Sequence, residues 1–112
     1  MIAILDYGSG NIRSAQRAIE RLGVSTEVTS EYEVALNAAG LLVPGVGAFG
    51  SCIRQLLQIN GDLILKERLK LNRPTLGVCV GMQILFESSA ESSETGLALV
   101  AGRVKKLSAK IL

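Results

Sequence analysis

The stretch that decides the fold is LGVCVGMQ, from Leu76 to Gln83. Its cysteine, Cys79, has one glycine two residues before it and another two residues after it, at Gly77 and Gly81. Turns that present a nucleophile between a strand and a helix need small residues at these positions, because the strained backbone brings them close together. The stretch therefore predicts a strand, a sharp turn at Cys79 and a helix after it.

The remainder of the chain repeats this order of strand and helix. Short apolar runs predict the strands, and apolar residues at helical spacing predict the helices between them. The expected strands are Ile2 to Leu5, Val24 to Val28, Leu41 to Val43 and Thr75 to Val78. The expected helices begin at Ile12, Glu31, Phe49, Asp62 and Met82, and the last of them covers Met82 to Phe86. This alternation indicates a doubly wound, mostly parallel α/β sheet. Uneven alternation from Leu97 to Leu112 predicts short paired strands.

The composition fits one α/β domain, which we take as residues 1–112. Apolar residues make up 48% of the chain and aromatic residues only 4%, which indicates a core of Val, Ile, Leu and Ala. A net charge of +2 is too small to indicate nucleic acid or an anionic membrane as a partner. The first apolar run is too short for a signal peptide or a membrane span, so we expect a cytoplasmic protein.

The two cysteines, Cys52 and Cys79, lie in segments of different character, which favours two reduced thiols over a disulfide. Cys52 has helical spacing with apolar residues, and we expect it in the core. The sequence contains no histidine, the commonest zinc ligand. We therefore expect no metal site and no cofactor.

Three glycine-rich turns follow three of the predicted strands: DYGSGN from Asp6, PGVG from Pro44 and GVCVG from Gly77. In open parallel sheets, reactive groups collect at the carboxyl ends of the strands, so these turns are expected to meet. The first of them is either a tight turn or a phosphate-binding loop, although Arg13 stands where the dinucleotide fingerprint has its third glycine.

The turn at Cys79 favours nucleophilic chemistry. The N-terminus of the next helix would stabilise a thiolate, and the N–H of Val80 would point to where an oxyanion develops. Gly45, Val46 and Gly47 can present a second N–H donor, because glycines leave the backbone unobstructed. The alternatives are a buried cysteine between packing glycines and, for PGVG, a simple turn.

In this order and at these separations, DYGSGN, VPGVGAF and LGVCVGMQ resemble the class I glutamine amidotransferases, most closely the glutaminase subunits of imidazole glycerol phosphate synthases. GLALVAGRVKKL is similar to the segment after the elbow helix in that family, so the resemblance covers essentially the whole chain. It implies a flavodoxin-like sheet and hydrolysis of glutamine to glutamate. It also implies a heterodimer in which ammonia passes to a cyclase subunit in histidine biosynthesis.

The resemblance also implies roles for individual residues. Cys79 is similar to the family's nucleophile, and Val80 to the residue whose N–H helps hold the oxyanion. Gly45, Val46 and Gly47 resemble the oxyanion loop, whose peptide orientation is thought to respond to the partner.

Three further positions follow from the same resemblance. Gln83 and Glu91 fall where the family contacts the substrate glutamine, and Gln83 could also be a solvated helix residue. Asn11 lies in a loop that faces the partner in this family, and it could equally be only a helix cap.

The sequence departs from the family in one respect. The family completes its catalytic triad with a histidine and a glutamate from a later segment, which is absent here, so we expect the N-terminal part of one amidotransferase domain, truncated at the C-terminus. Without a general acid for the departing ammonia, the chain alone should be inactive. Alternatives are a non-catalytic module that binds a partner, and the DJ-1-like proteins, which place histidine where Val80 stands.

Overall fold

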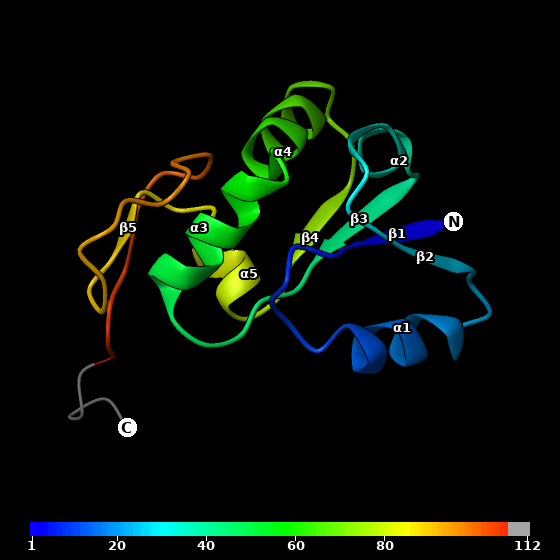
Figure 1. The fold of residues 1–112 in the computed structure, drawn as a ribbon, viewed down its shortest axis with the longest axis horizontal. Helices are drawn as coiled ribbons and strands as arrows, with labels where there is room; N and C mark the ends of the chain where they lie inside the picture. Colours follow the sequence, from blue (N-terminus) through cyan, green and yellow to red (C-terminus); the bar gives the residue numbers. More distant parts are fainter. Residues whose placement is uncertain (108–112) are drawn as a thin grey trace.

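A parallel sheet of four strands forms the centre of the structure, a computed structural model that describes residues 1–107 (Figure 1). The strands are β1 (Ile2–Leu5), β2 (Thr26–Thr29), β3 (Gly40–Val43) and β4 (Thr75–Gly77). They lie in the order β2-β1-β3-β4, and every neighbouring pair is parallel. The doubly wound parallel sheet predicted from the sequence is therefore confirmed, with β2 beginning two residues later than expected.

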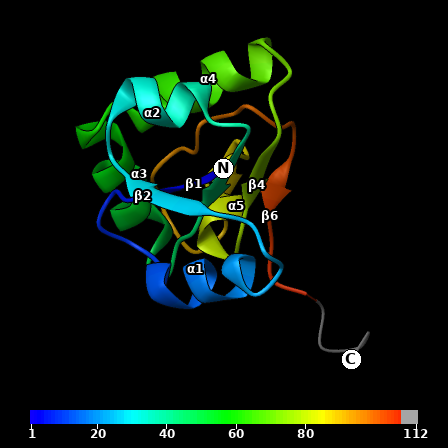
Figure 2. The same ribbon diagram turned by 90° about the vertical axis from the view of Figure 1, so that its right-hand side faces the viewer.

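The helices cover the two faces of the sheet unequally. Helix α1 (Ile12–Glu20) lies on one face, and α2 (Tyr32–Asn37) and α4 (Gly61–Lys70) lie on the other (Figure 2). Helix α3 (Phe49–Gln58) packs against α4 and lies on the same face, because its Phe49 and Leu56 belong to the same buried cluster as Leu41 and Val43 of β3. Burying one such side chain contributes roughly 1.5–3 kcal/mol, so this cluster is the main source of stability.

The last helix is shorter than the sequence predicts. Helix α5 runs from Val80 to Gln83, whereas the expected helix covered Met82 to Phe86. The carbonyl of Ile84 accepts a hydrogen bond from the N–H of Leu97, and the carbonyl of Leu85 accepts one from Leu99. A helix could not continue here, because its own later residues would need these carbonyls.

The segment after α5 contains a small second sheet. Strand β5 (Ser88–Ser89) pairs in parallel with β6 (Arg103–Val104), and Ser88 also forms an antiparallel bridge to Thr95. The prediction of short paired strands between Leu97 and Leu112 is thus met at β6, while its last five residues, 108–112, lie outside the described part. Within residues 1–107, no helix combines the length and apolar character that crossing a membrane requires.

A buried arginine joins the end of α2 to the start of β4. Arg68 of α4 is fully buried, and its guanidinium donates to five acceptors. These acceptors are the carbonyls of Ala35, Leu36, Ala38 and Pro74 and the hydroxyl of Thr75. Three of the carbonyls lie at the end of α2, where a helix leaves carbonyls without internal partners. Arg68 therefore fastens α2 and the start of β4 together.

Candidate active site

The loops that follow β1, β3 and β4 meet at the carboxyl end of the sheet, as the sequence predicts. The buried hydroxyl of Tyr7 donates to the carbonyl of Pro44. The N–H of Val78 donates to the carbonyl of Val43 over 3.0 Å, and the N–H of Val80 to that of Gly45 over 3.2 Å. All three glycine-rich turns are thus joined by direct hydrogen bonds.

Cys79 occupies a strained turn between β4 and α5. Its φ of 56° and ψ of −127° are unusual for a residue with a side chain. A Cβ at Gly81 would overlap the carbonyl oxygen of Val43, and a Cβ at Gly77 would lie 2.7 Å from the carbonyl oxygen of Gly81. Both glycines are therefore required by the close approach of the backbone, which is the geometry expected of a nucleophile elbow.

The two thiols differ in access, as the sequence predicts. Cys52 on α3 is fully buried, whereas Cys79 is exposed, and both are free. Helix α5 has only four residues, and the N–H of Val80 at its start is already bonded to Gly45. The helix dipole beside Cys79 is therefore that of a single turn.

The loop after β3 lies against the elbow. Gly45 is buried, and a Cβ there would lie 2.5 Å from the backbone nitrogen of Gly81. Gly47 has a φ of +88°, a region that favours glycine. Val46 between them is 56% exposed, and its N–H donates to the Ser9 hydroxyl over 3.1 Å. Close packing at Gly45 and backbone conformation at Gly47 explain why the two glycines are present.

The peptide unit between Gly45 and Val46 is hydrogen-bonded at both its carbonyl and its N–H. The carbonyl of Gly45 accepts from Val80, and the N–H of Val46 in the same peptide unit donates to Ser9. The N–H of Val80 and the N–H of Val46, one of the three predicted loop donors, are therefore both engaged within the protein in this structure.

Two residues of the first turn were not singled out from the sequence. Tyr7 is 4% exposed, and burial raises the pKa of its hydroxyl well above the ordinary value, so the group stays neutral as a donor to Pro44. Ser9 is 8% exposed and bonds to Val46. The sequence signal that could have identified Tyr7 and Ser9 was their place directly after a buried strand, in a turn expected to meet PGVG.

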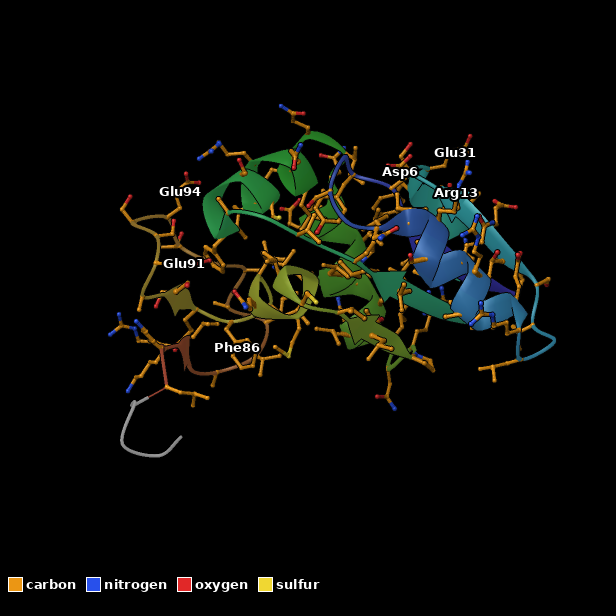
Figure 3. All side chains as sticks on the ribbon, turned by 90° about the horizontal axis from the view of Figure 1, so that it is seen from below. Asp6, Arg13, Glu31, Phe86, Glu91 and Glu94 are labelled. Atoms are coloured by element: carbon orange, nitrogen blue, oxygen red, sulfur yellow. The ribbon has the colours of Figure 1, made fainter. Side chains whose placement is uncertain are left out.

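Gln83 and Glu91 line the same cavity, of about 510 Å³. Lys105 and Lys106 line it too, although neither was predicted to lie at the site. The cavity thus places one carboxylate and two ammonium groups around a space that suits a small zwitterion. Figure 3 shows Glu91 on the loop that also carries Glu94, at the opposite end of the molecule from Arg13 on α1.

Asn11 is the N-cap residue of α1, which agrees with one of its two interpretations from the sequence. Its side-chain oxygen accepts from the N–H of Ser14 over 3.2 Å. Its second expected role, at an interface, stays a prediction.

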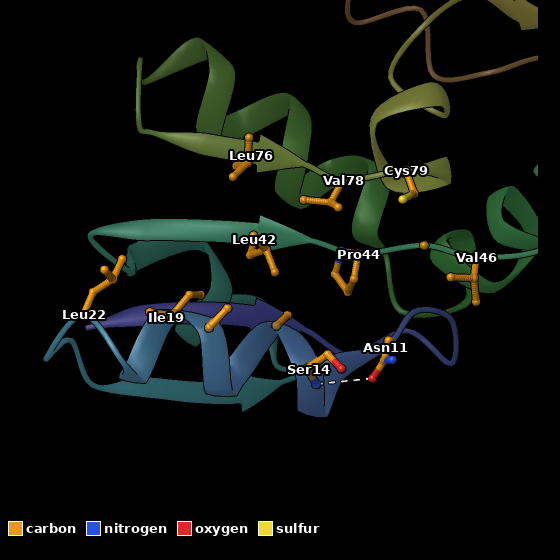
Figure 4. A pocket seen from close by; sticks show the side chains of 13 residues that line it. Asn11, Ser14, Ile19, Leu22, Leu42, Pro44, Val46, Leu76, Val78 and Cys79 are labelled. Atoms are coloured by element: carbon orange, nitrogen blue, oxygen red, sulfur yellow. Dashed lines mark hydrogen bonds between the residues drawn. The ribbon is translucent and has the colours of Figure 1, made fainter.

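A second cavity, of about 440 Å³, is an apolar groove between α1 and the sheet. Ile19 of α1 and Leu22, in the turn after that helix, line one side, and Leu42, Leu76 and Val78 line the other (Figure 4). Cys79 and Asn11 lie at one end of the groove, so the exposed thiol opens onto apolar surface. Among residues 1–107, no three His, Cys, Asp or Glu side chains are grouped to hold a metal ion.

Comparisons with known proteins agree with this geometry. The sequence pattern of the family "Glutamine amidotransferase class-I" matches residues 3–110. "Imidazole glycerol phosphate synthase subunit HisH" of Corynebacterium diphtheriae is 52% identical over 113 aligned residues, covering 99% of this chain and 54% of the relative. The protein of that name from Mycobacterium bovis is 56% identical over 90 residues, covering 80% of this chain and 44% of the relative.

A solved structure shares the fold. "Crystal structure of glutamine amidotransferase" superposes with a TM-score of 0.78 over 93% of this chain and 55% of the other, at 19% sequence identity. The chain spans about half the length of the curated relatives it matches.

Proposed function

Since the chain belongs to the class I glutamine amidotransferase family, we propose that it supplies the nucleophile, the oxyanion loop and part of the glutamine pocket of a glutaminase. The observation that carries this proposal is the exposed Cys79 on a strained turn, flanked by glycines that the backbone contacts require. An exposed thiol held in this way is suited to attack a substrate carbonyl.

The reaction assigned to Cys79 is hydrolysis of a carboxamide. Its sulfur bonds to the carboxamide carbon, the carbonyl electron pair moves to oxygen, and the thiol proton passes to a base. Collapse of this intermediate breaks the carbon–nitrogen bond, and a general acid protonates the leaving ammonia. Water then releases glutamate from the thioester. This chain contains no histidine, so we propose that a base and acid from outside these 112 residues complete the site.

Stabilising the oxyanion requires the Gly45–Val46 peptide to turn. As described, Val80 donates to the carbonyl of this unit, and the N–H of Val46 points to Ser9. A half-turn of the unit would release the N–H of Val80 and bring the N–H of Val46 beside it. The two N–H groups would then face an oxyanion at Cys79, and this arrangement lowers the barrier because its donors are fixed before reaction.

The cavity lined by Gln83 and Glu91 is the proposed site for the α-amino and α-carboxylate groups of glutamine. Glu91 would bind the ammonium group, and Lys105 or Lys106 would neutralise the carboxylate. Gln83 lies on α5, one turn after Cys79, so a substrate held here would extend its carboxamide toward the elbow.

We further propose that the partner is the cyclase subunit of an imidazole glycerol phosphate synthase, that Asn11 lies near that partner, and that the protein works in the cytoplasm. The names of the relatives support the partner, because each is a subunit of such a synthase. A non-catalytic role in binding this partner is the alternative.

A covalent probe tests the proposed role of Cys79. The chain is treated with the chloroketone analogue of glutamine, and the adduct is located by peptide mass spectrometry. We expect alkylation of Cys79, slowed by added glutamine, with Cys52 as an internal control in the same molecule. Preferential labelling of Cys52, or labelling that glutamine does not slow, would refute the assignment.

A further inference from the structure

The loop that carries Glu91, residues 90–95, is fastened to the rest of the protein at both of its ends. The N–H of Ala90 donates to the carbonyl of Val104 over 2.9 Å, and the N–H of Gly96, directly after the loop, donates to that of Glu87 over 2.8 Å. Glu91 itself is exposed. Its carboxylate is therefore placed by the course of the loop rather than by packing around its side chain.

An ion pair also ties this loop to helix α3. The carboxylate of Glu94 accepts a hydrogen bond from the guanidinium of Arg54, and the two groups form a salt bridge. Arg54 also reaches the hydroxyl of Ser51, one turn earlier on the same helix, at 3.4 Å. Among residues 1–107 no other salt bridge is present. This contact is therefore the one ion pair that joins the loop to a helix.

The first turn of α3 leaves room for the Glu94 carboxylate. A Cβ at Gly50 would lie 2.6 Å from a carboxylate oxygen of Glu94 and 3.3 Å from a guanidinium nitrogen of Arg54. Gly50 lies within the helix and has no positive φ, so its backbone does not require glycine. The missing side chain at Gly50 thus matches the position of the ion pair.

The ion pair links two parts of the proposed site. Helix α3 begins two residues after Gly47 of the proposed oxyanion loop. Glu91 lines the proposed glutamine cavity and also a smaller cavity, of about 260 Å³, which Arg54 and Glu94 help to line. A shift of the loop relative to α3 would therefore change both cavities and move the Glu91 carboxylate.

We propose that Arg54 is a positioning residue that acts through Glu94 to hold the loop where Glu91 can bind the ammonium group of glutamine. This inference rests on the proposed function, because that function gives Glu91 its role. The side chains of Arg54 and Glu94 are 60% and 35% exposed, and ion pairs between exposed groups are weak. Loss of the pair should weaken glutamine binding about two- to fivefold and leave the reactivity of the thiol unchanged.

Saturation kinetics at Cys79 separate binding from reactivity. The chloroketone analogue of glutamine carries the ammonium and carboxylate groups of glutamine, so its half-saturating concentration reports binding, and its maximal alkylation rate reports the thiol. The Cys79 thiolate displaces chloride, a sulfur–carbon bond replaces the carbon–chlorine bond, and the thiol proton goes to buffer. Iodoacetamide has neither charged group, and its rate gives the reactivity of the thiol alone.

We expect Arg54→Ala and Glu94→Ala each to raise the half-saturating chloroketone concentration about two- to fivefold, with the maximal rate and the iodoacetamide rate unchanged. The double variant should bind no more weakly than either single variant, because both changes remove the same ion pair. Arg54→Lys should retain most of the binding, since one carboxylate oxygen does not need the guanidinium fork. Arg13→Ala, at an exposed position at the opposite end of the molecule from Glu91, is the control.

An unchanged half-saturating concentration in Arg54→Ala would overturn the proposal. So would losses that add in the double variant, or a loss confined to the maximal rate.

A change at Gly50 sets binding against stability. Alanine suits a helix better than glycine, so Gly50→Ala should not lower the free energy of unfolding in urea. Its methyl group should nevertheless displace the Glu94 carboxylate, the movable end of a side chain, and weaken chloroketone binding as Arg54→Ala does. Unchanged binding in Gly50→Ala would contradict the proposal.

A measurement without any glutamine analogue tests the loop itself. Hydrogen exchange of the Glu94 amide, whose N–H donates to the Ser92 hydroxyl over 3.1 Å, should be faster in Arg54→Ala than in the unmodified chain. Equal exchange in the two proteins would overturn the proposal, whatever the analogue does. Failure of the proposed function would look different, since glutamine would then not slow the alkylation of Cys79 in the unmodified chain.

Discussion

The two faces of the central sheet differ in how completely the chain covers them. On one face, Leu41 and Val43 are 2% and 0% exposed, and they pack with residues of α2, α3 and α4. On the other face α1 is the only helix in the described residues, and Leu76 of β4 is 60% exposed at the edge of the apolar groove. The covered face thus carries the stability of the fold, whereas the open face leads to Cys79 and to the proposed chemistry.

The largest expected effect is on activity at the open face. The chain alone should show no appreciable glutaminase activity, because a general base and acid each contribute about 10²- to 10⁴-fold to rate. Adding the remainder of a HisH relative as a separate polypeptide, together with the cyclase subunit, should restore ammonia release from glutamine. Full-rate hydrolysis by the 112-residue chain alone would show that the proposed base and acid are not needed.

Matched leucine substitutions compare the stability of the two faces. Leu65 of α4 is fully buried, so Leu65→Ala should lower the free energy of unfolding by about 2–5 kcal/mol. Leu76→Ala, on the open face, should lower it by about 0.5 kcal/mol or less. Urea denaturation of both variants measures the difference, and equal losses would mean that the open face is packed in solution.

A pair of glycines separates function from backbone strain. Gly47 and Gly23 have φ values of +88° and +80°, and a Cβ added at either glycine would meet no other atom within 4 Å. Valine should therefore strain both sites similarly, but only Gly47→Val changes the proposed oxyanion loop. In the enzyme completed as above, Gly47→Val should lower turnover by about tenfold or more, with Gly23→Val as the control. Equal turnover in the two variants would show that PGVG is only a structural turn.

The smallest expected effect concerns the apolar groove itself. Leu22→Lys and Leu76→Lys place charge on exposed groove positions, so each should change stability by only about 0.5 kcal/mol. They should, however, reduce self-association and the fluorescence of a bound apolar dye, because exposed apolar patches promote both. Leu63→Lys, at a 50% exposed position on α4, is the matched control on the opposite side. If it acts as strongly, the groove has no special role.

The sequence predicts best what depends on neighbouring residues. The four strands, the elbow glycines and the burial of Cys52 follow from short apolar runs, helical spacing and the demands of a tight turn. The early end of α5 could not be predicted, because it depends on hydrogen bonds from Leu97 and Leu99 to Ile84 and Leu85.

Parts of the site are hidden from the sequence for the same reason. Lys105 joins Gln83 and Glu91 only because β6 pairs with β5 and brings distant residues together. Ser9 gains its contact with Val46 because the loops after β1 and β3 approach one another, across 37 positions of sequence. A resemblance to a family indicates which positions matter. It does not show that the N–H of Val46 is already bonded to Ser9 and the N–H of Val80 to Gly45.

Arg68 has a consequence for how the two ends of the sheet can behave. Its five hydrogen bonds reach the end of α2, which leads into β3, and the start of β4, opposite the loops that carry Gly45 and Cys79. A guanidinium with a fixed fork of donors suits several carbonyls at once, which a lysine cannot match. The amino end of the sheet is thus held by side-chain hydrogen bonds. A peptide at the carboxyl end can therefore rotate without disturbing the register of the strands.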